Sequence, residues 1–252
     1  MQIVRFRVEN KTRYGALEGA VVVEYAGTPW SLFRRGRRRY ALRQVVLLAP
    51  VQPTKIVGVG LNHREHAVGL GLAVPDEPLL FFKPVTALVG PGDPIVAPTA
   101  SKHVECEATL AAVIKRRCRH VPAARAREYV QGYAGLNDVT ARDIQDRGGD
   151  WTRARAFDTF CPVGPCIATD VDPHAATLET WVNGAPRVSA STAGLVLPVE
   201  EIVARLSEIM TLLPGDVVAI GAPGASGPVD AGDRVEIRIA GVGALRNPVV
   251  RL

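Results

Sequence analysis

The stretch 104–114, V-E-C-E-A-T-L-A-A-V-I, constrains the fold more than any other part of this chain. Its β-branched and apolar residues alternate with period two, which predicts a β-strand. Side chains at i, i+2 and i+4 of a strand share one face, so we expect Glu105, Glu107 and Thr109 to point the same way. Two carboxylates on one face repel each other, so this face needs a cation or solvent beside it.

A second polar stretch, L-N-D-V-T-A-R-D-I-Q at 136–145, supplies Asp138, Arg142 and Gln145. If Asp138 meets Glu105 and Glu107, the three carboxylates would suit a hard divalent ion such as Mg²⁺ or Mn²⁺. A solvated strand edge followed by an ordinary helix start would produce the same letters. Spacing alone leaves both interpretations open.

Composition places the chain among globular proteins. It has 252 residues, 47% hydrophobic and 22% charged, enough for one large domain or one domain with a small companion. No apolar run approaches the roughly 18 residues of a membrane span, and the start M-Q-I-V-R-F-R-V lacks a signal-peptide core. We therefore expect a cytoplasmic protein with no membrane partner. The four cysteines show no C-x-x-C spacing, which favours buried free thiols.

The positive charge is concentrated in the first fifty residues, which carry ten Lys/Arg against three Asp/Glu. Most of the excess is the run F-R-R-G-R-R-R-Y at 33–40. Such a run can bind nucleic acid, but it lacks interleaved aromatic residues and no recognisable helix motif lies beside it. We predict a solvated loop and no nucleic-acid partner.

Periodicity and turn signals predict the remaining elements. Asn62 can cap a short helix that follows it. An apolar stripe predicts a helix over 198–212, and a weaker pattern predicts one over 122–131. A turn is expected at Asn183-Gly184, and residues 151–165 resemble a loop feeding a strand. Strands are predicted at Gln2–Val8, Tyr14–Leu17, Ala20–Tyr25, Lys55–Gly60, Val217–Gly221 and Arg234–Ile239.

Several long motifs occur in one order along the chain. They include K-I-V-G-V-G-L-N-H-R-E-H at 55–66, F-F-K-P-V-T-A-L-V-G-P-G-D-P-I at 81–95 and W-T-R-A-R-A-F-D-T-F-C-P-V-G-P at 151–165. Together with E-A-T-L-A-A-V-I and G-L-N-D-V-T-A-R-D-I-Q, they resemble the fumarylacetoacetate hydrolase family, including its isomerase-type and acylpyruvase-type members.

The resemblance implies an α+β, mainly β, fold. It implies a rolled β-sheet core at residues 55–252, forming the catalytic domain, and a small N-terminal β region at residues 1–50. It further implies a divalent metal site, a homodimer, and small 2-oxo acid or β-dicarbonyl substrates.

The same resemblance shows four departures from the family pattern. Gly69 stands where relatives have a Glu that pairs with the histidine of R-x-H, and Ala222 replaces a Thr. Arg155 replaces a Lys, and Thr109 replaces the second Glu of the metal motif E-x-E. The predicted metal ligands are therefore Glu107 and Asp138, with Glu105 as a possible third, and we expect Mg²⁺ or Mn²⁺ to bind weakly or not at all.

The resemblance also suggests roles for the other polar residues. His66, with His63 as a second candidate, would relay a proton, and Arg155 would stabilise an enolate. Substrate-binding candidates are Lys83, Arg142 and Gln145.

Three functions remain open. The first is a metal enzyme that isomerises, decarboxylates or hydrolyses a C–C bond of an oxo acid. The second is a metal-independent cyclase or isomerase on the same fold, in a specialised biosynthetic pathway. The third is a non-catalytic binding protein.

Overall fold

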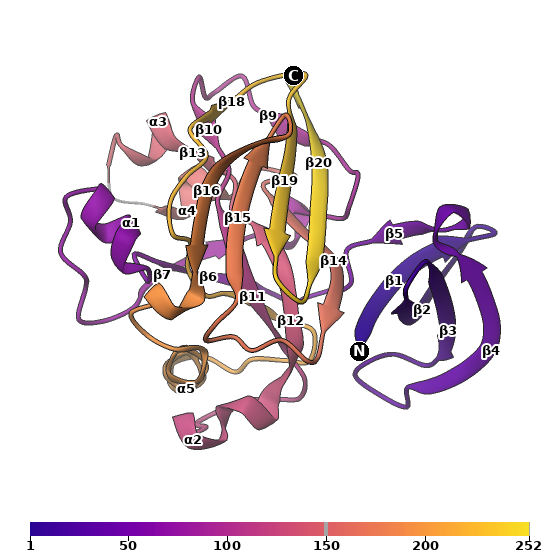
Figure 1. Ribbon diagram of the computed structural model, residues 1–252. Helices are drawn as coiled ribbons and strands as arrows, with labels where there is room; N and C mark the ends of the chain where they lie inside the picture. The colour runs from indigo at the N-terminus through magenta and orange to yellow at the C-terminus, as the bar shows by residue number, and fades with distance from the viewer. Residues whose placement is uncertain (149–150, 252) are drawn as a thin grey trace.

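The computed structural model describes residues 1–148 and 151–251, and here the chain is mainly β-structure with short helices (Figure 1). This confirms the predicted α+β, mainly β, class. The strands of these residues form a twelve-stranded, a five-stranded and a three-stranded sheet. In the described part of the chain, no helix is long and apolar enough to cross a membrane.

The first strands form an antiparallel meander at one end of the large sheet, seen to one side in Figure 1. They are β1 (Gln2–Val8), β2 (Lys11–Glu18), β3 (Val21–Ala26), β4 (Arg34–Ala41) and β5 (Val46–Leu48). The basic run predicted as a loop is the edge strand β4, so that prediction was wrong. It pairs with β3 and keeps its arginines in solvent, where Arg35 and Arg39 reach Glu18.

The large sheet continues from β1 through β14, β12, β11, β17, β6 and β7. These are β14 (Cys161–Ala168), β12 (Val130–Asn137), β11 (Ala108–Ile114), β17 (Val217–Ala219), β6 (Ile56–Gly60) and β7 (Leu79–Lys83), with β8 (Leu88–Val89) beside β14. Every residue of β11 and β6 is buried. Burial on both faces explains why these strands consist almost entirely of small and apolar residues.

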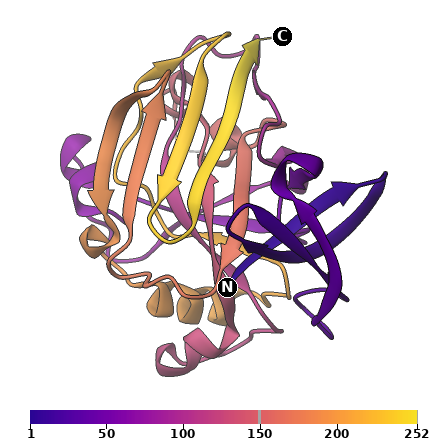
Figure 2. The same cartoon turned by 45° about the vertical axis from the view of Figure 1, so that its right-hand side comes forward.

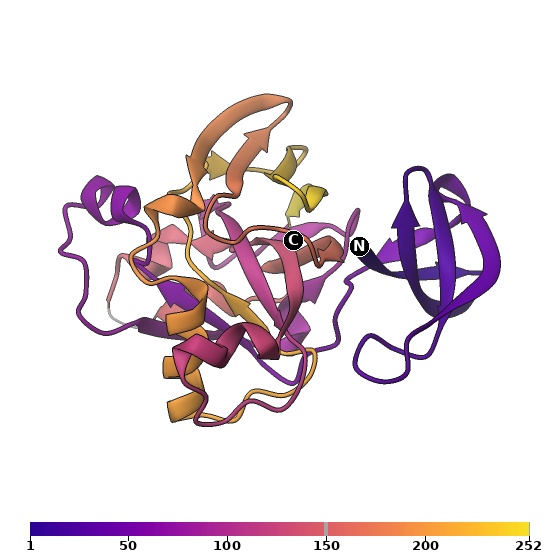
Figure 3. The ribbon, with the colours of Figure 1, turned by 60° about the horizontal axis from the view of Figure 1, so that its bottom comes forward.

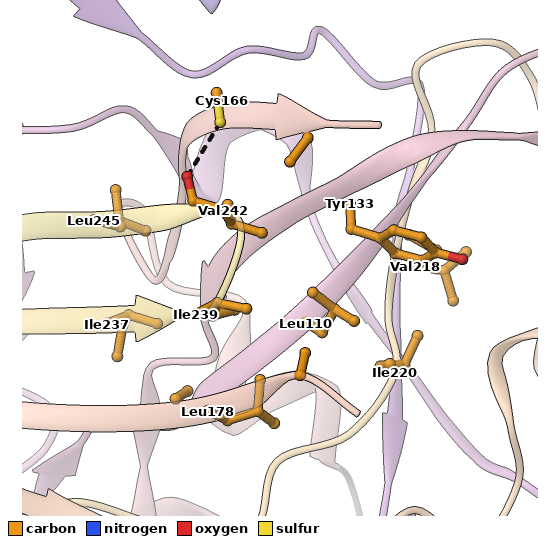
Figure 4. Packing of buried hydrophobic residues seen from close by; sticks show 14 of the residues in the cluster. Leu110, Tyr133, Cys166, Leu178, Val218, Ile220, Ile237, Ile239, Val242 and Leu245 are labelled. Atoms are coloured by element: carbon orange, nitrogen blue, oxygen red, sulfur yellow. Dashed lines mark hydrogen bonds between the residues drawn. The ribbon is translucent and has the colours of Figure 1, made fainter. Parts of the chain in front are cut away.

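The five-stranded sheet lies in front of β11 and β12 in Figure 1, and Figure 2 shows its strands side by side. Its order is β16 (Ala185–Ser191), β15 (Thr177–Val182), β19 (Arg234–Ile239), β20 (Gly243–Arg251) and β9 (Ile95–Ala97). Leu178, Ile237 and Ile239 face Leu110 between the two sheets (Figure 4). The two sheets therefore enclose the main core, and the predicted turn at Asn183-Gly184 joins β15 to β16.

The stretch 104–114 is two strands, so the prediction of one continuous strand was wrong. β10 (Val104–Glu105) belongs to the three-stranded sheet, between β13 (Thr140–Ala141) and β18 (Pro228–Val229). At the break, the Cys106 amide donates to Ser226 and the Glu107 amide donates to Asn137. These side-chain acceptors replace the ladder bonds, and they let the chain change sheets at Glu107.

The helices are short. They are α1 (Arg64–Gly69), α2 (Ala123–Ala126), α3 (Arg142–Gln145), α4 (Trp151–Arg155) and α5 (Val199–Ile209), and Figure 3 shows α2 beside α5. The apolar stripe of 198–212 does form α5. The helix predicted over 122–131 was too long, because the chain enters β12 at Val130. The region predicted as a loop after Trp151 begins instead with the helical turn α4.

Candidate functional site

Carboxylates and cations from six parts of the chain meet where β10 ends. Glu105 and Glu107 come from β10 and the break behind it, Asp138 from the end of β12, and Lys83 from the end of β7. Helices α3 and α4 add two arginines, described below, and α1 adds His66. All of these residues are at most 8% exposed, so each charge needs a partner nearby.

Arg142 joins the two glutamates of the stretch 104–107. Its Nε donates to Glu105 Oε2 at 2.7 Å and its Nη2 donates to Glu107 Oε1. The structure thus places Glu105 and Glu107 together as predicted, with a guanidinium between them. Among the described residues, Nη1 of Arg142 is buried and has no hydrogen-bond partner. This nitrogen is a donor that a bound oxygen atom could satisfy.

Arg155 lies deeper and meets three oxygen atoms. Its Nη2 donates to Glu107 Oε2 and its Nε to Asp138 Oδ2, both at 3.2 Å, while its Nη1 donates to Gln145 Oε1. Its guanidinium carbon lies 4.6 Å from the ring centroid of Phe81 and 4.5 Å from that of Trp151. Ion pairs and aromatic faces together hold a charged group that is 1% exposed.

The glycines of β6 make room for these two rings. A Cβ at Gly58 would lie 2.1 Å from the Phe81 ring, and one at Gly60 would lie 2.4 Å from the Trp151 ring. Both distances are far inside van der Waals contact, so larger residues would force the rings away. The motif G-V-G therefore positions Arg155 indirectly.

Lys83 has no donor left for a substrate. Its Nζ donates to the carbonyls of Val139, Arg155 and Phe160 at 2.8–3.1 Å and lies 2.8 Å from Asp138 Oδ1. An ammonium has three N–H groups, so these protein oxygens use all of them. The predicted substrate-binding role of Lys83 stays a prediction, and in this structure the side chain links β7 to Asp138 and to the loop after α4.

The electrostatics keep Glu107 ionised. Burial alone would raise the pKa of this carboxyl, but the charges of Arg155 and Arg142 outweigh it and hold the pKa well below its usual range. The pKa of Arg142 is raised in turn, since the carboxylates of Glu107 and Glu105 overcome its own burial. Glu107 and Arg142 therefore both carry their charges at neutral pH.

His66 borders the cluster, and each of its ring nitrogens lies near one oxygen atom. Its Nδ1 lies 3.2 Å from the carbonyl oxygen of Ala222, and its Nε2 lies 4.0 Å from Glu107 Oε1. A carbonyl only accepts, so this contact requires the proton on Nδ1 and, in the neutral ring, leaves a lone pair on Nε2. Ala222, where relatives have a Thr, thus contributes through its backbone.

His63 points elsewhere. Its Nε2 lies 3.0 Å from the carbonyl of Ser191, and a Cβ at Gly194 would be 2.5 Å from its ring. No hydrogen bond or ion pair in residues 1–148 and 151–251 joins it to the carboxylates. The expectation of a catalytic His63 does not match this placement. Asn62, expected to cap α1, instead donates to the carbonyls of Leu197 and Ile220.

A cavity of about 400 Å³ opens beside the cluster. His66, Glu105 and Arg142 line it, whereas Arg155 is not among its lining residues. The other lining residues are Glu65, Gly69, Leu70, Asp146, Pro223, Gly224 and Ala225. A larger hollow of about 590 Å³ between α2 and α5 is lined by none of the cluster residues. The smaller cavity is therefore the candidate substrate site, and Arg142 is its cation.

The carboxylates do not fit a divalent metal. Glu105 faces Arg142 and His103, Glu107 faces both arginines, and Asp138 faces Lys83 and Arg155. Within the described residues, no group of three His, Cys, Asp or Glu side chains is arranged to hold a metal. The expected ligands Glu105, Glu107 and Asp138 therefore come together around cations of the protein itself.

Sequence reasoning missed His103, Phe81 and Trp151. His103 Nε2 lies 2.9 Å from Glu105 Oε1. The spacing H-x-E on a predicted strand could have indicated this pair, because residues i and i+2 share a face. The aromatic rings carry no comparable signal, since their contact with Arg155 joins β7 and α4 across a long stretch of sequence.

Comparison with known proteins gives matches over nearly the whole chain. Residues 55–250 match the family model described as fumarylacetoacetate (FAA) hydrolase C-terminal. Residues 1–50 match the model described as Rv2993c-like, N-terminal.

Three similar proteins carry functional names. The 5-carboxymethyl-2-hydroxymuconate delta-isomerase structure from Mycobacterium smegmatis is 42% identical, with TM-score 0.93 and full coverage of both chains. Oxaloacetate tautomerase Fahd2a of Rattus norvegicus is 38% identical over 82% of this chain and 70% of its own. Maleylpyruvate hydrolase from Sphingobium sp. SYK-6, solved with manganese(II) and pyruvate, is 32% identical, with TM-score 0.82 and coverage of 100% and 99%.

Proposed function

The chain belongs to the fumarylacetoacetate hydrolase family, and on that premise we propose that it is an enzyme moving a proton on a small 2-oxo acid or β-dicarbonyl compound. The intermediate is an enolate, and the simplest reaction of this kind is keto–enol tautomerisation. The observation that carries the proposal is that His66 and Arg142 line one cavity. Nε2 of the neutral His66 ring carries a lone pair, and Nη1 of Arg142 has no hydrogen-bond partner among residues 1–148 and 151–251.

The proposed steps follow from these two groups. Nε2 of His66 removes a proton from the carbon beside the substrate carbonyl, and the electron pair moves onto the carbonyl oxygen. Arg142 donates an N–H to that oxygen, or to a carboxylate of the substrate, and so stabilises the added negative charge. The imidazolium then returns the proton to oxygen, which completes the tautomerisation without loss or gain of atoms.

The remaining polar residues position these two. Glu107 holds Arg142 and lies beside His66, and Arg155 keeps Glu107 in place from behind. In this proposal Arg155 does not touch the substrate, Gln145 binds Arg155 instead of a ligand, and His63 and Lys83 support the fold. Residues 1–50 and 55–252 would be separate units, with the chemistry confined to the second.

Hydrolysis of a C–C bond is less favoured by the same contacts. It needs an activated water, and Gly69 provides no carboxylate beside His66. Tautomerisation needs only one base and one cation, which the cavity supplies.

Oxaloacetate is a suitable test substrate because it is a small 2-oxo acid with a slow keto–enol equilibrium. Ultraviolet absorbance of the enol measures tautomerisation, and a coupled lactate dehydrogenase assay measures release of pyruvate by decarboxylation. His66→Ala should lower kcat roughly a hundredfold or more, the usual contribution of a positioned base. His174→Ala is the matched control, since His174 also pairs with a carboxylate, Glu200, but on the surface.

Loss of the wild-type rate only in the His66 variant would support the proposal. Equal rates for wild type and His66→Ala, on oxaloacetate and on an acylpyruvate, would contradict it. Release of pyruvate from an acylpyruvate with no tautomerisation of oxaloacetate would favour the hydrolase alternative.

A further inference from the structure

The three nitrogens of Arg155 meet three oxygens from three elements. They are Oε2 of Glu107, just after β10, Oδ2 of Asp138, just after β12, and Oε1 of Gln145, in α3. All three oxygens therefore surround one planar cation, each accepting from a different nitrogen. Two carboxylates and one amide carbonyl are oxygen ligands of the kind that hard divalent ions prefer.

We propose that the Arg155 guanidinium is the resident cation of this cluster, filling a position that would otherwise bind a divalent ion. Occupancy of this position by Arg155 does not depend on the proton transfer described above. It predicts that the wild-type chain does not bind Mn²⁺ here, and that removing the guanidinium creates a binding site.

Charge balance supports this assignment. The cluster contains three carboxylates, Glu105, Glu107 and Asp138, and three protein cations, Lys83, Arg142 and Arg155. A divalent ion added beside them would leave excess positive charge in a buried site, which is strongly unfavourable.

The packing supports it as well. Arg155 is 1% exposed and lies over the rings of Phe81 and Trp151, so it cannot swing into solvent to admit an ion without breaking these contacts. Nearby on β11, the Thr109 hydroxyl is buried and has no hydrogen-bond partner in the described part of the chain. A metal motif with Glu at this position would have supplied a further ligand, and Thr109 supplies none.

The test is Mn²⁺ binding, measured by electron paramagnetic resonance of the free ion and by titration calorimetry. Wild type should leave the free-ion signal unchanged at millimolar Mn²⁺. Arg155→Ala should bind one equivalent at least tenfold more tightly than wild type, and Glu107→Gln added to it should abolish binding. Arg238→Ala is the matched control, because Arg238 also stacks on a ring, Trp181, and pairs with Glu236, but near the surface.

A second variant covers the case in which Arg155→Ala does not fold. Thr109→Glu with Arg155→Lys restores the residues of the family motif at both positions and keeps a buried cation. It should bind Mn²⁺ and show a higher Tm when the ion is present.

Stoichiometric Mn²⁺ binding by the wild type that is lost in Glu107→Gln would overturn the proposal. So would absence of binding in a folded Arg155→Ala, or in the double variant if the single one does not fold. A wild type that binds no Mn²⁺ and also fails to tautomerise oxaloacetate would refute the proposed function and leave this inference standing.

Discussion

Replacing Glu107 by Gln should destabilise the protein far more than the same change at Glu128. Both glutamates pair with two arginines: Glu107 with Arg142 and Arg155, and Glu128 with Arg116 and Arg125. They differ in burial, because the Glu107 side chain is 1% exposed and that of Glu128 is 47% exposed. The comparison therefore isolates the effect of burial on one arrangement of charges.

The magnitude follows from the cost of an uncompensated buried charge. Removing one partner of a buried ion pair typically costs about 3–5 kcal/mol, because the remaining cation stays out of water. For a chain of this size, that corresponds to a Tm lower by roughly 6–20 °C. Solvent screens the Glu128 pairs, so Glu128→Gln should change Tm little.

Urea denaturation followed by circular dichroism and by tryptophan fluorescence measures both variants. The slope of the free energy of unfolding against urea should match wild type if only stability has changed. High salt should reduce whatever small effect Glu128→Gln has, and should leave the Glu107→Gln effect largely intact, because buried pairs are screened less. Similar small losses of unfolding free energy for both variants would refute the view that the buried ion pairs of Glu107 stabilise the fold more than exposed ones.

Three further predictions concern the acid titration of Glu107 and substitutions at Thr109 and Gly60. Because the pKa of Glu107 is lowered in the folded chain, its stabilisation is complete above its ordinary value of 4.5 and is lost as the pH falls toward the lower folded value. In acid titrations, the free energy of unfolding of wild type should therefore fall more steeply below about pH 4.5 than that of Glu107→Gln. Thr109→Val should be neutral or stabilising by up to about 1 kcal/mol in urea denaturation, since the hydroxyl has no partner in the described residues. Gly60→Ala should cost about 1–3 kcal/mol and alter tryptophan fluorescence, because its Cβ would collide with the Trp151 ring.

The sequence could predict which charged residues gather at the site, because strand alternation and short separation within a motif can both be read from neighbouring residues. Strand alternation predicts that Glu105 and Glu107 share one face. In the motif N-D-V-T-A-R-D-I-Q, Asp138 and Arg142 are only four residues apart in sequence. The structure brings these four residues together. Arg155, which the family resemblance assigned to the site, joins them through its ion pairs with Glu107 and Asp138.

The orientation of Lys83 and His63 could not be predicted, because it depends on contacts distant in sequence. Lys83 is held by carbonyls 56–77 residues away, and His63 by a carbonyl 128 residues away. The break at Cys106–Glu107 has the same origin, since Ser226 and Asn137 supply its acceptors. The basic run misled for another reason: an edge strand keeps its side chains in water, so its composition resembles that of a loop.

Thr109 and Arg155 are two of the four departures from the family motif, and both change how the buried carboxylates are satisfied. A site with Glu at position 109 and Lys at position 155 would carry one more carboxylate and would leave the oxygens of Glu107 and Asp138 free for an ion. Thr109 removes one negative charge from that arrangement. Arg155 then supplies several donors in one plane, enough to satisfy Glu107, Asp138 and Gln145 at once, whereas an ammonium could not present this fork. Because Lys and Arg carry the same charge, only the change at 109 alters the charge of the site, whereas the change at 155 alters its hydrogen-bond donors. Under our proposal, the two changes together exchange a metal ion for a guanidinium.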